Sequence, residues 1–119
     1  MNVLLISYNK LFLRSLNYLC LTERYSALSA ETAETAFSAL GAQTFDIVVI
    51  GSDIVTNEQH EFANAAKQNR NTAVLLLYEG SFNPEILADA VVDVMSGTEE
   101  IRSALRRLQP EGRRPPPTV

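Results

Sequence analysis

The residues best suited to chemistry follow a buried apolar segment in the middle of the chain. The stretch "VVIGSDIV", residues 48–55, is typical of a covered strand that ends at Gly51, with Asp53 two residues later. A carboxylate can act as nucleophile, acid or base, whereas glycine brings no side chain. Asp53 would point to the same side as Gly51 but about 6–7 Å farther along. Two roles are open for Asp53, a phosphoryl acceptor or a loop or helix cap, and we expect the second.

Apolar runs of strand length alternate with helical patterns five times along the chain. Continuous rather than alternating apolarity indicates strands that are covered on both faces. The expected strands cover residues 2–7, 25–30, 45–51, 72–78 and 90–95, and the expected helices end near residues 22, 40, 68 and 108, with a short helix after residue 83.

Local signals set the expected helix boundaries. Asn9 is a suitable N-cap for the first helix, and Gly41 is expected to stop the second. Asn83 and Pro84 suit the start of a short helix. Capping boxes are expected at Thr56–Gln59 and Ser96–Glu99.

This order predicts an α/β fold, a five-stranded parallel doubly wound sheet with helices on both faces. Sites in such sheets lie beyond the carboxyl ends of the strands. The side chains expected there are those of Ser7, Tyr8, Asn9, Gly51, Ser52, Asp53, Tyr78, Glu79, Met95 and Ser96.

Composition limits the class of protein. The chain has 119 residues, 46% hydrophobic and 20% charged, which suits one globular domain. A single cysteine, Cys20, excludes an internal disulfide framework, and the N-terminus has no basic leader. No glycine-rich phosphate loop follows the first strand, so no cofactor is expected. We expect a cytoplasmic protein with no membrane segment.

Charge is unevenly distributed along the chain. Residues 1–101 carry a net charge of −8 and residues 102–119 a net charge of +4. The acidic body argues against direct nucleic-acid binding by this domain. The segment 109–119, "QPEGRRPPPTV", cannot continue a helix, so we expect a domain over 1–108 and a flexible Pro/Arg-rich tail or linker over 109–119.

Three segments together resemble the receiver domain of bacterial response regulators, over residues 2 to about 108. They are "NVLLISYNKLFLRSLNYLC", "ALSAETAETAFSAL" and "FDIVVIGSDI". The resemblance implies a flavodoxin-like fold and a role in two-component signal transduction or a phosphorelay. Because the residues of the family's site are missing here, as described next, we expect no enzyme activity.

The resemblance also implies a site that this chain has lost. Family members bind Mg²⁺ with an acidic pair after the first strand, and Ser7 and Tyr8 stand there. Family members accept phosphate on an aspartate after the third strand, and Gly51 stands there. They use a Thr or Ser at the end of the fourth strand, where this chain has Tyr78. Their lysine after the fifth strand aligns with Ser96, or with Val94 if the gap is moved, and no Lys or Arg lies between residues 70 and 102. Neutral hydroxyls are poor Mg²⁺ ligands, so we expect no metal.

The sequence also predicts a vacated phosphorylation pocket and two candidate interaction surfaces. Tyr8 and Tyr78 could close over the pocket, or they could be unrelated. An excess of apolar residues on the first helix, including Phe12 and Tyr18, could bind a partner or belong to a wide core. The last helix carries a narrow seam that could support a weak homodimer, made of Leu105 and Leu108 beside Arg102 and Arg106.

The favoured hypothesis is a pseudo-receiver: a non-catalytic signalling module that binds a protein partner or another domain. Two alternatives stay open. One is the N-terminal input or dimerisation domain of a longer transcriptional regulator. The other is an atypical receiver that binds a phosphoryl group or a small molecule through Asp53.

Overall fold

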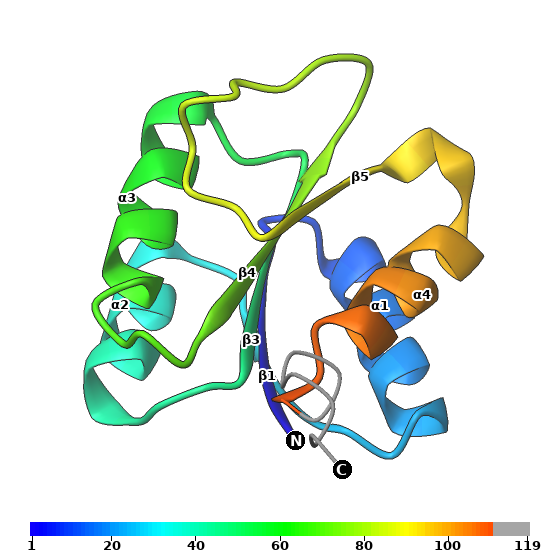
Figure 1. The fold of residues 1–119 in the computed structure, drawn as a ribbon, viewed down its shortest axis with the longest axis horizontal. Coiled ribbons are helices and arrows are strands. Elements are labelled where there is room, and N and C mark those ends of the chain that lie inside the picture. The colour runs from blue at the N-terminus through cyan, green and yellow to red at the C-terminus, as the bar shows by residue number, and fades with distance from the viewer. Residues whose placement is uncertain (111–119) are drawn as a thin grey trace, which may run out of the picture.

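Five parallel strands form a single sheet in the computed structural model, which describes residues 1–110 (Figure 1). The strand order is β2-β1-β3-β4-β5, and every neighbouring pair is parallel. The strands are β1 Asn2–Ile6, β2 Ser26–Ala30, β3 Ile47–Ile50, β4 Ala73–Tyr78 and β5 Ala90–Asp93. The helices are α1 Lys10–Thr22, α2 Ala33–Ala42, α3 Thr56–Ala66 and α4 Thr98–Arg107, with a 3₁₀ turn η1 at Val94–Ser96. The predicted fold class is confirmed.

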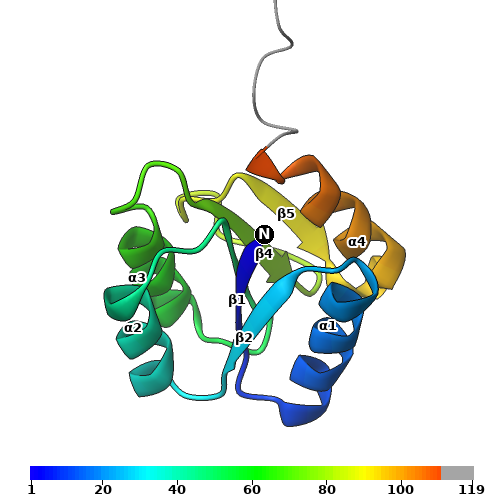
Figure 2. The same ribbon diagram turned by 90° about the horizontal axis from the view of Figure 1, so that it is seen from below.

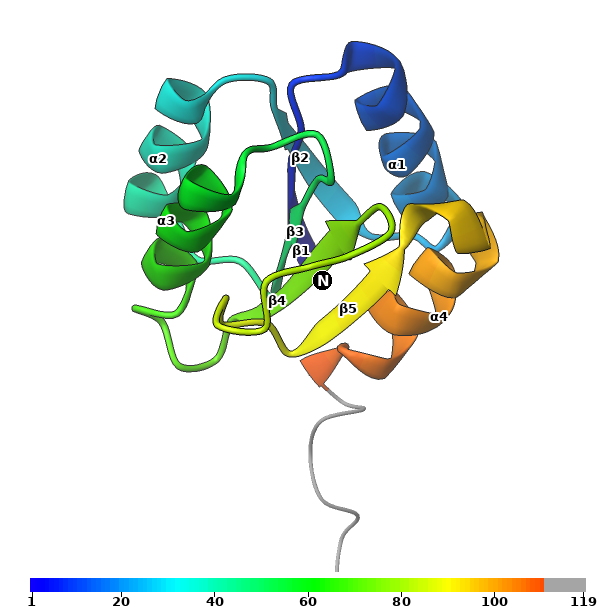
Figure 3. The same cartoon turned by 90° about the horizontal axis from the view of Figure 1, so that it is seen from above.

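The helices cover the sheet in pairs. Helices α1 and α4 lie on one face, and α2 and α3 lie on the other (Figures 2 and 3). The central strand β3 shows why apolarity runs without a break. Ile47 and Val49 belong to the core under α1 and α4, and Val48 and Ile50 to the core under α2 and α3. Each β3 side chain is therefore buried, whichever face it points to.

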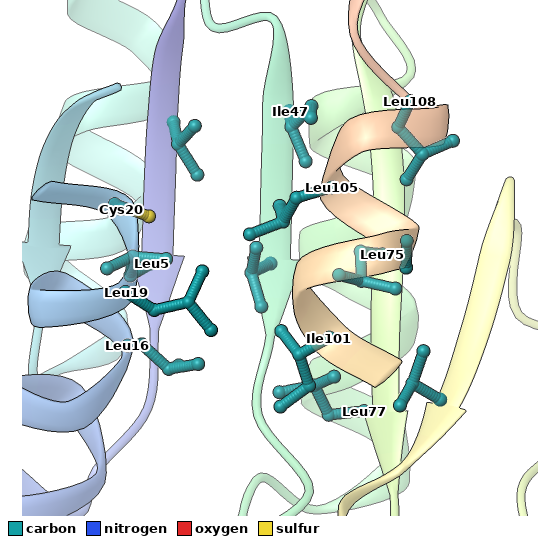
Figure 4. Close-up of a cluster of buried hydrophobic side chains, with 14 of the residues drawn as sticks. Leu5, Leu16, Leu19, Cys20, Ile47, Leu75, Leu77, Ile101, Leu105 and Leu108 are labelled. Atoms are coloured by element: carbon teal, nitrogen blue, oxygen red, sulfur yellow. The ribbon is translucent and has the colours of Figure 1, made fainter. Parts of the chain in front are cut away.

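Helix α4 contributes its apolar stripe to the first of these cores. Ile101, Leu105 and Leu108 point toward the strands, opposite Leu16, Leu19 and Cys20 of α1 (Figure 4). Leu105 is 1% exposed. The prediction that Leu105 and Leu108 form a dimer seam is therefore wrong, because both side chains are used inside the protomer. Burial also raises the pKa of the Cys20 thiol to about 11.

Only part of the predicted capping chemistry is present. Asn9 caps α1, and its Oδ1 accepts from the backbone N–H groups of Leu11 and Phe12. Helix α2 continues through Gly41 and ends at Ala42, so the predicted stop is wrong. Phe37 of α2 is exposed, and its ring pairs with that of Phe62 with centroids 4.8 Å apart, while Ala36 and Ala39 are buried.

Both predicted capping boxes are also wrong. Val55, not Thr56, precedes α3 and gives no side-chain cap. Gly97 precedes α4 with a φ of +97°, a conformation that glycine adopts without strain, and it takes the position expected for Ser96. In each case the residue that precedes the helix lies one position away from the predicted N-cap. Neither helix therefore has a side-chain cap hydrogen bond.

The connection from β4 to β5 contains no helix. The helix predicted after Asn83 is a single turn, in which Asn83 Oδ1 accepts from the Glu85 N–H and the Asn83 carbonyl accepts from the Ile86 N–H. The segment must return along β4, whose six residues span about 20 Å. A helix over residues 84–89 would rise only about 9 Å, so the chain runs extended instead.

Asp89 fastens the end of this extended connection to the start of β4. Its N–H donates to the Val74 carbonyl at 2.8 Å, and its Oδ2 accepts from the Val74 N–H at 2.7 Å. Lys67 Nζ donates to the same oxygen at 2.5 Å. These bonds place Ile86 against the core under α2 and α3.

The two ends of the described chain meet at one pair of residues. The Met1 carbonyl accepts from the Ser26 N–H at 2.9 Å, and Gln109 Nε2 donates to the Tyr25 hydroxyl at 2.5 Å. Helix α4 ends at Arg107 with Leu108 as its cap, close to the predicted domain boundary. The predicted tail lies, from residue 111 on, outside the described residues. Within residues 1–110, no helix is long and apolar enough to cross a membrane.

Candidate functional site

Asp53 joins the ends of β1 and β3. Its Oδ1 accepts from the Ser7 hydroxyl at 2.8 Å, and its Oδ2 accepts from the Tyr8 backbone N–H at 2.7 Å. Ser7 is completely buried, and its Oγ also accepts from the Asn9 N–H at 3.1 Å. The carboxylate therefore turns back toward the sheet and holds the turn that leads into α1. Both carboxylate oxygens of Asp53 are thus engaged in this turn, and the cap of α1 itself is Asn9.

Gly51 lies directly beneath that carboxylate. A Cβ at this position would lie 2.6 Å from Asp53 Oδ1, 3.0 Å from the Ile6 carbonyl oxygen and 3.1 Å from Ser7 Cβ. The Gly51 N–H donates to the Ile6 carbonyl at 2.8 Å, which fixes the close approach of the two strands. Glycine suits this position because the Asp53 carboxylate fills the space that a side chain at position 51 would enter.

Tyr8 extends the same network to α3. Its hydroxyl donates to Glu58 Oε2 in the first turn of that helix. Partial burial, this hydrogen bond and the nearby negative charges of Glu58, Asp53 and Glu61 all raise the pKa of the Tyr8 phenol above its usual range. The phenol therefore stays protonated at neutral pH and acts as a donor.

Gln59 ties α3 to the end of β3. Its Nε2 donates to the Gly51 carbonyl at 3.1 Å, and the Ile54 N–H donates to the same oxygen at 3.3 Å. The residue expected to complete a capping box thus supports the turn after Gly51 instead.

The other two residues assigned to the vacated pocket have separate surroundings. The Tyr78 ring pairs with Phe82, with ring centroids 4.9 Å apart and planes tilted by 47°. Tyr8 and Tyr78 thus have different partners, Glu58 and Phe82, which fits the second of the two alternatives, that the tyrosines are unrelated. Ser96 lies exposed in η1 beyond β5, and β4 separates β5 from β3. Of the six predicted pocket residues, the structure brings together Ser7, Tyr8, Gly51 and Asp53.

Within residues 1–110, no group of three or more His, Cys, Asp or Glu side chains is arranged to hold a metal ion. Asp53 and Glu58 are the acidic partners of the network, and both are engaged by donors.

The predicted interaction surface divides between the two helices. On α4, Arg102 and Arg106 both bind Glu23, at N–O distances of 3.0 and 2.7 Å. Glu23 is 12% exposed at its side chain, and the hydrogen bond from Arg106 is the main cause that lowers the pKa of its carboxyl. These arginines are therefore engaged within the protomer rather than free for a partner.

On α1 the apolar residues divide between the core and the exposed surface. Leu13, Leu16 and Leu19 are buried, while Phe12 is half-buried. Tyr18 is 70% exposed, and Leu11 and Leu21 are exposed to a similar degree. The sequence pattern identified Phe12 and Tyr18 but did not separate the exposed stripe of Leu11, Tyr18 and Leu21 from the core stripe.

Sequence analysis missed Glu58, Gln59 and Phe82 at the site. Glu58 and Gln59 lie one turn into the helix after β3, where side chains can reach back over a strand end, and that position was the available signal. Phe82 carried no such signal, because its partner Tyr78 belongs to β4 and the intervening turn was not predicted.

Comparison with known proteins decides the fold. No protein-family model matches the sequence, and no curated protein matches it. Among solved structures, the chemotaxis response regulator CheY4 of Vibrio cholerae is 16% identical, with a TM-score of 0.76 over 90% of this chain and 97% of that one. This is the receiver fold.

Two further similar structures contain magnesium. The response regulator TrrA from Thermotoga maritima, in complex with Mg²⁺-BeF, is 18% identical with a TM-score of 0.74 and covers 90% of this chain and 97% of its own. The receiver domain of a sensor histidine kinase from Pseudomonas aeruginosa, with magnesium coordinated in its active-site cleft, is 11% identical with a TM-score of 0.74 and covers 90% of this chain and 95% of its own. At sequence identities of 11–18%, these comparisons show a shared fold and nothing further.

Proposed function

We propose that this chain is a receiver-like signalling module that acts by binding a protein partner or another domain, without aspartyl phosphorylation and without enzyme activity. The observation that carries the proposal is the Asp53 carboxylate above Gly51. It fills the space of a side chain at position 51, and the donors Ser7 and Tyr8 hold it there. In that position the carboxylate is already hydrogen-bonded through both oxygens, by the Ser7 hydroxyl and the Tyr8 N–H.

The residue types around Asp53 support the same conclusion. Ser7 and Tyr8 offer a hydroxyl and a backbone N–H in place of metal-binding carboxylates. No lysine or arginine occurs in the sequence between residues 70 and 102, so neither β4 nor β5 can present a cation to a transferred phosphoryl group. The assignment of Tyr78 and Ser96 to this degenerate pocket stays a prediction.

The partner surface that we favour is the exposed stripe of α1. Leu11, Tyr18 and Leu21 project from one helix into solvent, which is an unusual grouping on a domain of this size. Tyr18 also lines a groove of about 460 Å³ between α1 and α4, together with Arg14, Ser15, Leu19, Thr98 and Arg102. Arg102 is held by Glu23, so the stripe and the exposed guanidinium of Arg14 are the groups offered to a protein partner. A weak homodimer, if one forms, would use this stripe. We place the module in the cytoplasm.

A second candidate function rests on the same carboxylate. Because Asp53 lies where the side chain of position 51 would enter, it could accept a phosphoryl group by an atypical route. We therefore test the two candidates against each other. The hypothesis of a longer transcriptional regulator depends on residues beyond 119 and stays a prediction.

The test is incubation of the full chain with acetyl phosphate and Mg²⁺, followed by intact-mass measurement. A phosphorylation-competent receiver in the same tube serves as the positive control. We expect the control to gain one phosphoryl group and this chain to keep its mass. A gain of one phosphoryl group that disappears in Asp53→Asn would replace the first candidate with the second.

A further inference from the structure

A separate pocket opens beyond the carboxyl ends of β3 and β4. It has a volume of about 400 Å³ and lies between the turn that follows β3 and the connection that follows β4. Among the residues that line it are Ser52, Thr56, Gln59, Tyr78, Glu79 and Phe82. Small-molecule sites commonly have about 300–1,000 Å³, and in α/β folds they lie beyond the strand ends. Asp53 and Ser7 do not line this pocket, so it is distinct from the site above Gly51.

Gln59 presents an unsatisfied acceptor at this pocket. The residue is 8% exposed, and its Nε2 is fixed on the Gly51 carbonyl. Its Oε1 has no hydrogen-bond partner within the described part of the chain. That oxygen is not sealed in the interior either, since Arg102 Nε is the only fully buried side-chain polar atom in residues 1–110 that lacks a hydrogen-bond partner. A buried side chain with one end anchored and the other open to a pocket is suited to accept a hydrogen bond from a ligand.

An aromatic pair forms one wall of the same pocket. The rings of Tyr78 and Phe82 lie 4.9 Å apart, and Phe82 is 42% exposed. A flat ring could pack on the open face of Phe82 and recover apolar contact area that is now in water. Phe82 belongs to the extended connection from β4 to β5.

The charge of the pocket selects against anions. Its lining includes the Glu79 carboxylate, and no Lys, Arg or His is among the described residues that line it. The remaining polar groups include the hydroxyls of Ser52 and Thr56. A phosphate or carboxylate would meet negative charge with no cation to offset it.

We propose that this pocket binds a flat heteroaromatic molecule that carries N–H donors and no negative charge, of the class of a free nucleobase, a nucleoside or an aromatic amine. The ring packs on Phe82, an N–H group donates to Gln59 Oε1, and Glu79 favours a neutral or cationic molecule. The proposal concerns ligand binding only and does not depend on whether Asp53 can be phosphorylated.

The experiment is a titration of the ¹⁵N-labelled full chain, followed by amide chemical shifts. The probes are adenosine, cytidine and tryptamine, with adenosine monophosphate as the anionic counterpart of adenosine. We expect at least one uncharged or cationic probe to shift the amides of residues 52–59 and 79–83, and the monophosphate to bind at least fivefold more weakly than adenosine. Glu79→Gln should reduce that difference.

Two variants test the named contacts. Phe82→Ala removes a largely exposed ring and should weaken binding about tenfold without loss of the folded spectrum. Tyr18→Ala, which removes an exposed ring on α1, is the matched control and should leave binding unchanged. The proposal is wrong if no probe shifts these amides at millimolar concentration, if the monophosphate binds as well as adenosine, or if Phe82→Ala and Tyr18→Ala behave alike.

Discussion

Ser7 donates its hydroxyl hydrogen to Asp53 across 2.8 Å, and this bond joins two turns that are 46 residues apart in the sequence. Ser7 follows β1 and is completely buried, whereas Asp53 follows β3 and is exposed. The bond brings a charged group over the one position in the site that has no side chain, Gly51. The stability of the site should therefore depend on the absence of a side chain at residue 51.

Substitution of Gly51 by alanine tests this dependence. The added methyl would lie 2.6 Å from Asp53 Oδ1 and 3.0 Å from the Ile6 carbonyl oxygen, so something must move. We expect Gly51→Ala to lower the free energy of unfolding by about 1–3 kcal/mol, as overpacking usually does. Denaturant midpoints with unchanged slopes measure it.

Gly41→Ala is the control for that substitution. Gly41 lies inside α2, and a Cβ there would meet nothing within 4 Å. Alanine should stabilise the helix by about 0.5–1 kcal/mol. If both variants shift stability in the same direction, close packing above Gly51 is not the cause.

The second prediction concerns the coupling of Asp53 to Gly51. Asp53→Ala removes two hydrogen bonds from an exposed carboxylate and should cost about 1 kcal/mol. It also removes the oxygen nearest to the added methyl. In the Asp53→Ala background, Gly51→Ala should therefore cost about 1 kcal/mol less than in the parent chain. Strict additivity in this double-mutant cycle would show that the carboxylate does not occupy the space above Gly51.

The third prediction concerns acid stability. Glu23 receives hydrogen bonds from Arg106 and Arg102, and these bonds lower the pKa of its carboxyl below the ordinary value of 4.5. The unfolded chain therefore binds a proton at a higher pH than the folded chain does. The stabilising contribution is present above pH 4.5 and is lost as the pH falls through the lower pKa of the folded state.

Glu23→Gln should flatten that part of the stability curve. We expect the variant and the parent to converge in stability as the pH falls below the ordinary range of glutamate. Glu61→Gln, an exposed change on α3, is the matched control and should leave the difference between pH 7 and acid almost unaltered. Parallel curves for Glu23→Gln and the parent would contradict the prediction. Urea midpoints at a series of pH values provide the measurement.

The fourth prediction separates core from surface on the two helices that were expected to bind partners. Leu105→Ala should destabilise the domain by about 2–5 kcal/mol, because Leu105 is fully buried. Tyr18→Ala should change stability by no more than about 0.5 kcal/mol. Sedimentation at rising concentration then reports on self-association. Any dimer should weaken in the Tyr18 variant, and a dimer that survives it would move the contact away from α1.

The sheet and its helices could be predicted because their signals are local. Apolar runs such as 47–50 and 73–77 identify covered strands. Asn9 marks the start of α1, because its side chain caps N–H groups only two and three residues away. The crossover after β4 was mispredicted because Asn83 and Pro84 suit a helix start and a single turn equally well. The length of β4 decides between them.

The site could be predicted only in part, because its decisive contacts span long stretches of chain. The sequence places Ser7, Gly51 and Asp53 at neighbouring strand ends, but the direction of the Asp53 side chain depends on the shape of the turn after Gly51. An amphipathic pattern on α4 could not show whether Leu105 faces its own sheet or a second molecule. The partner of Arg106 is Glu23, 83 residues away, and no periodicity indicates such a pair.

This domain is suitable for circular permutation, because its two ends bind neighbouring residues. Met1 is hydrogen-bonded to Ser26 and Gln109 to Tyr25. With the ends of residues 1–110 side by side, a short glycine-rich linker from Gln109 to Met1 would close the chain without crossing the sheet. New termini could then be opened in an exposed turn, such as that between α2 and β3 near Gln43, or in the connection after Tyr78. The two openings would differ in a useful way. The first leaves the aromatic pair of Tyr78 and Phe82 on one continuous segment, whereas the second places its two rings at opposite ends of the new chain.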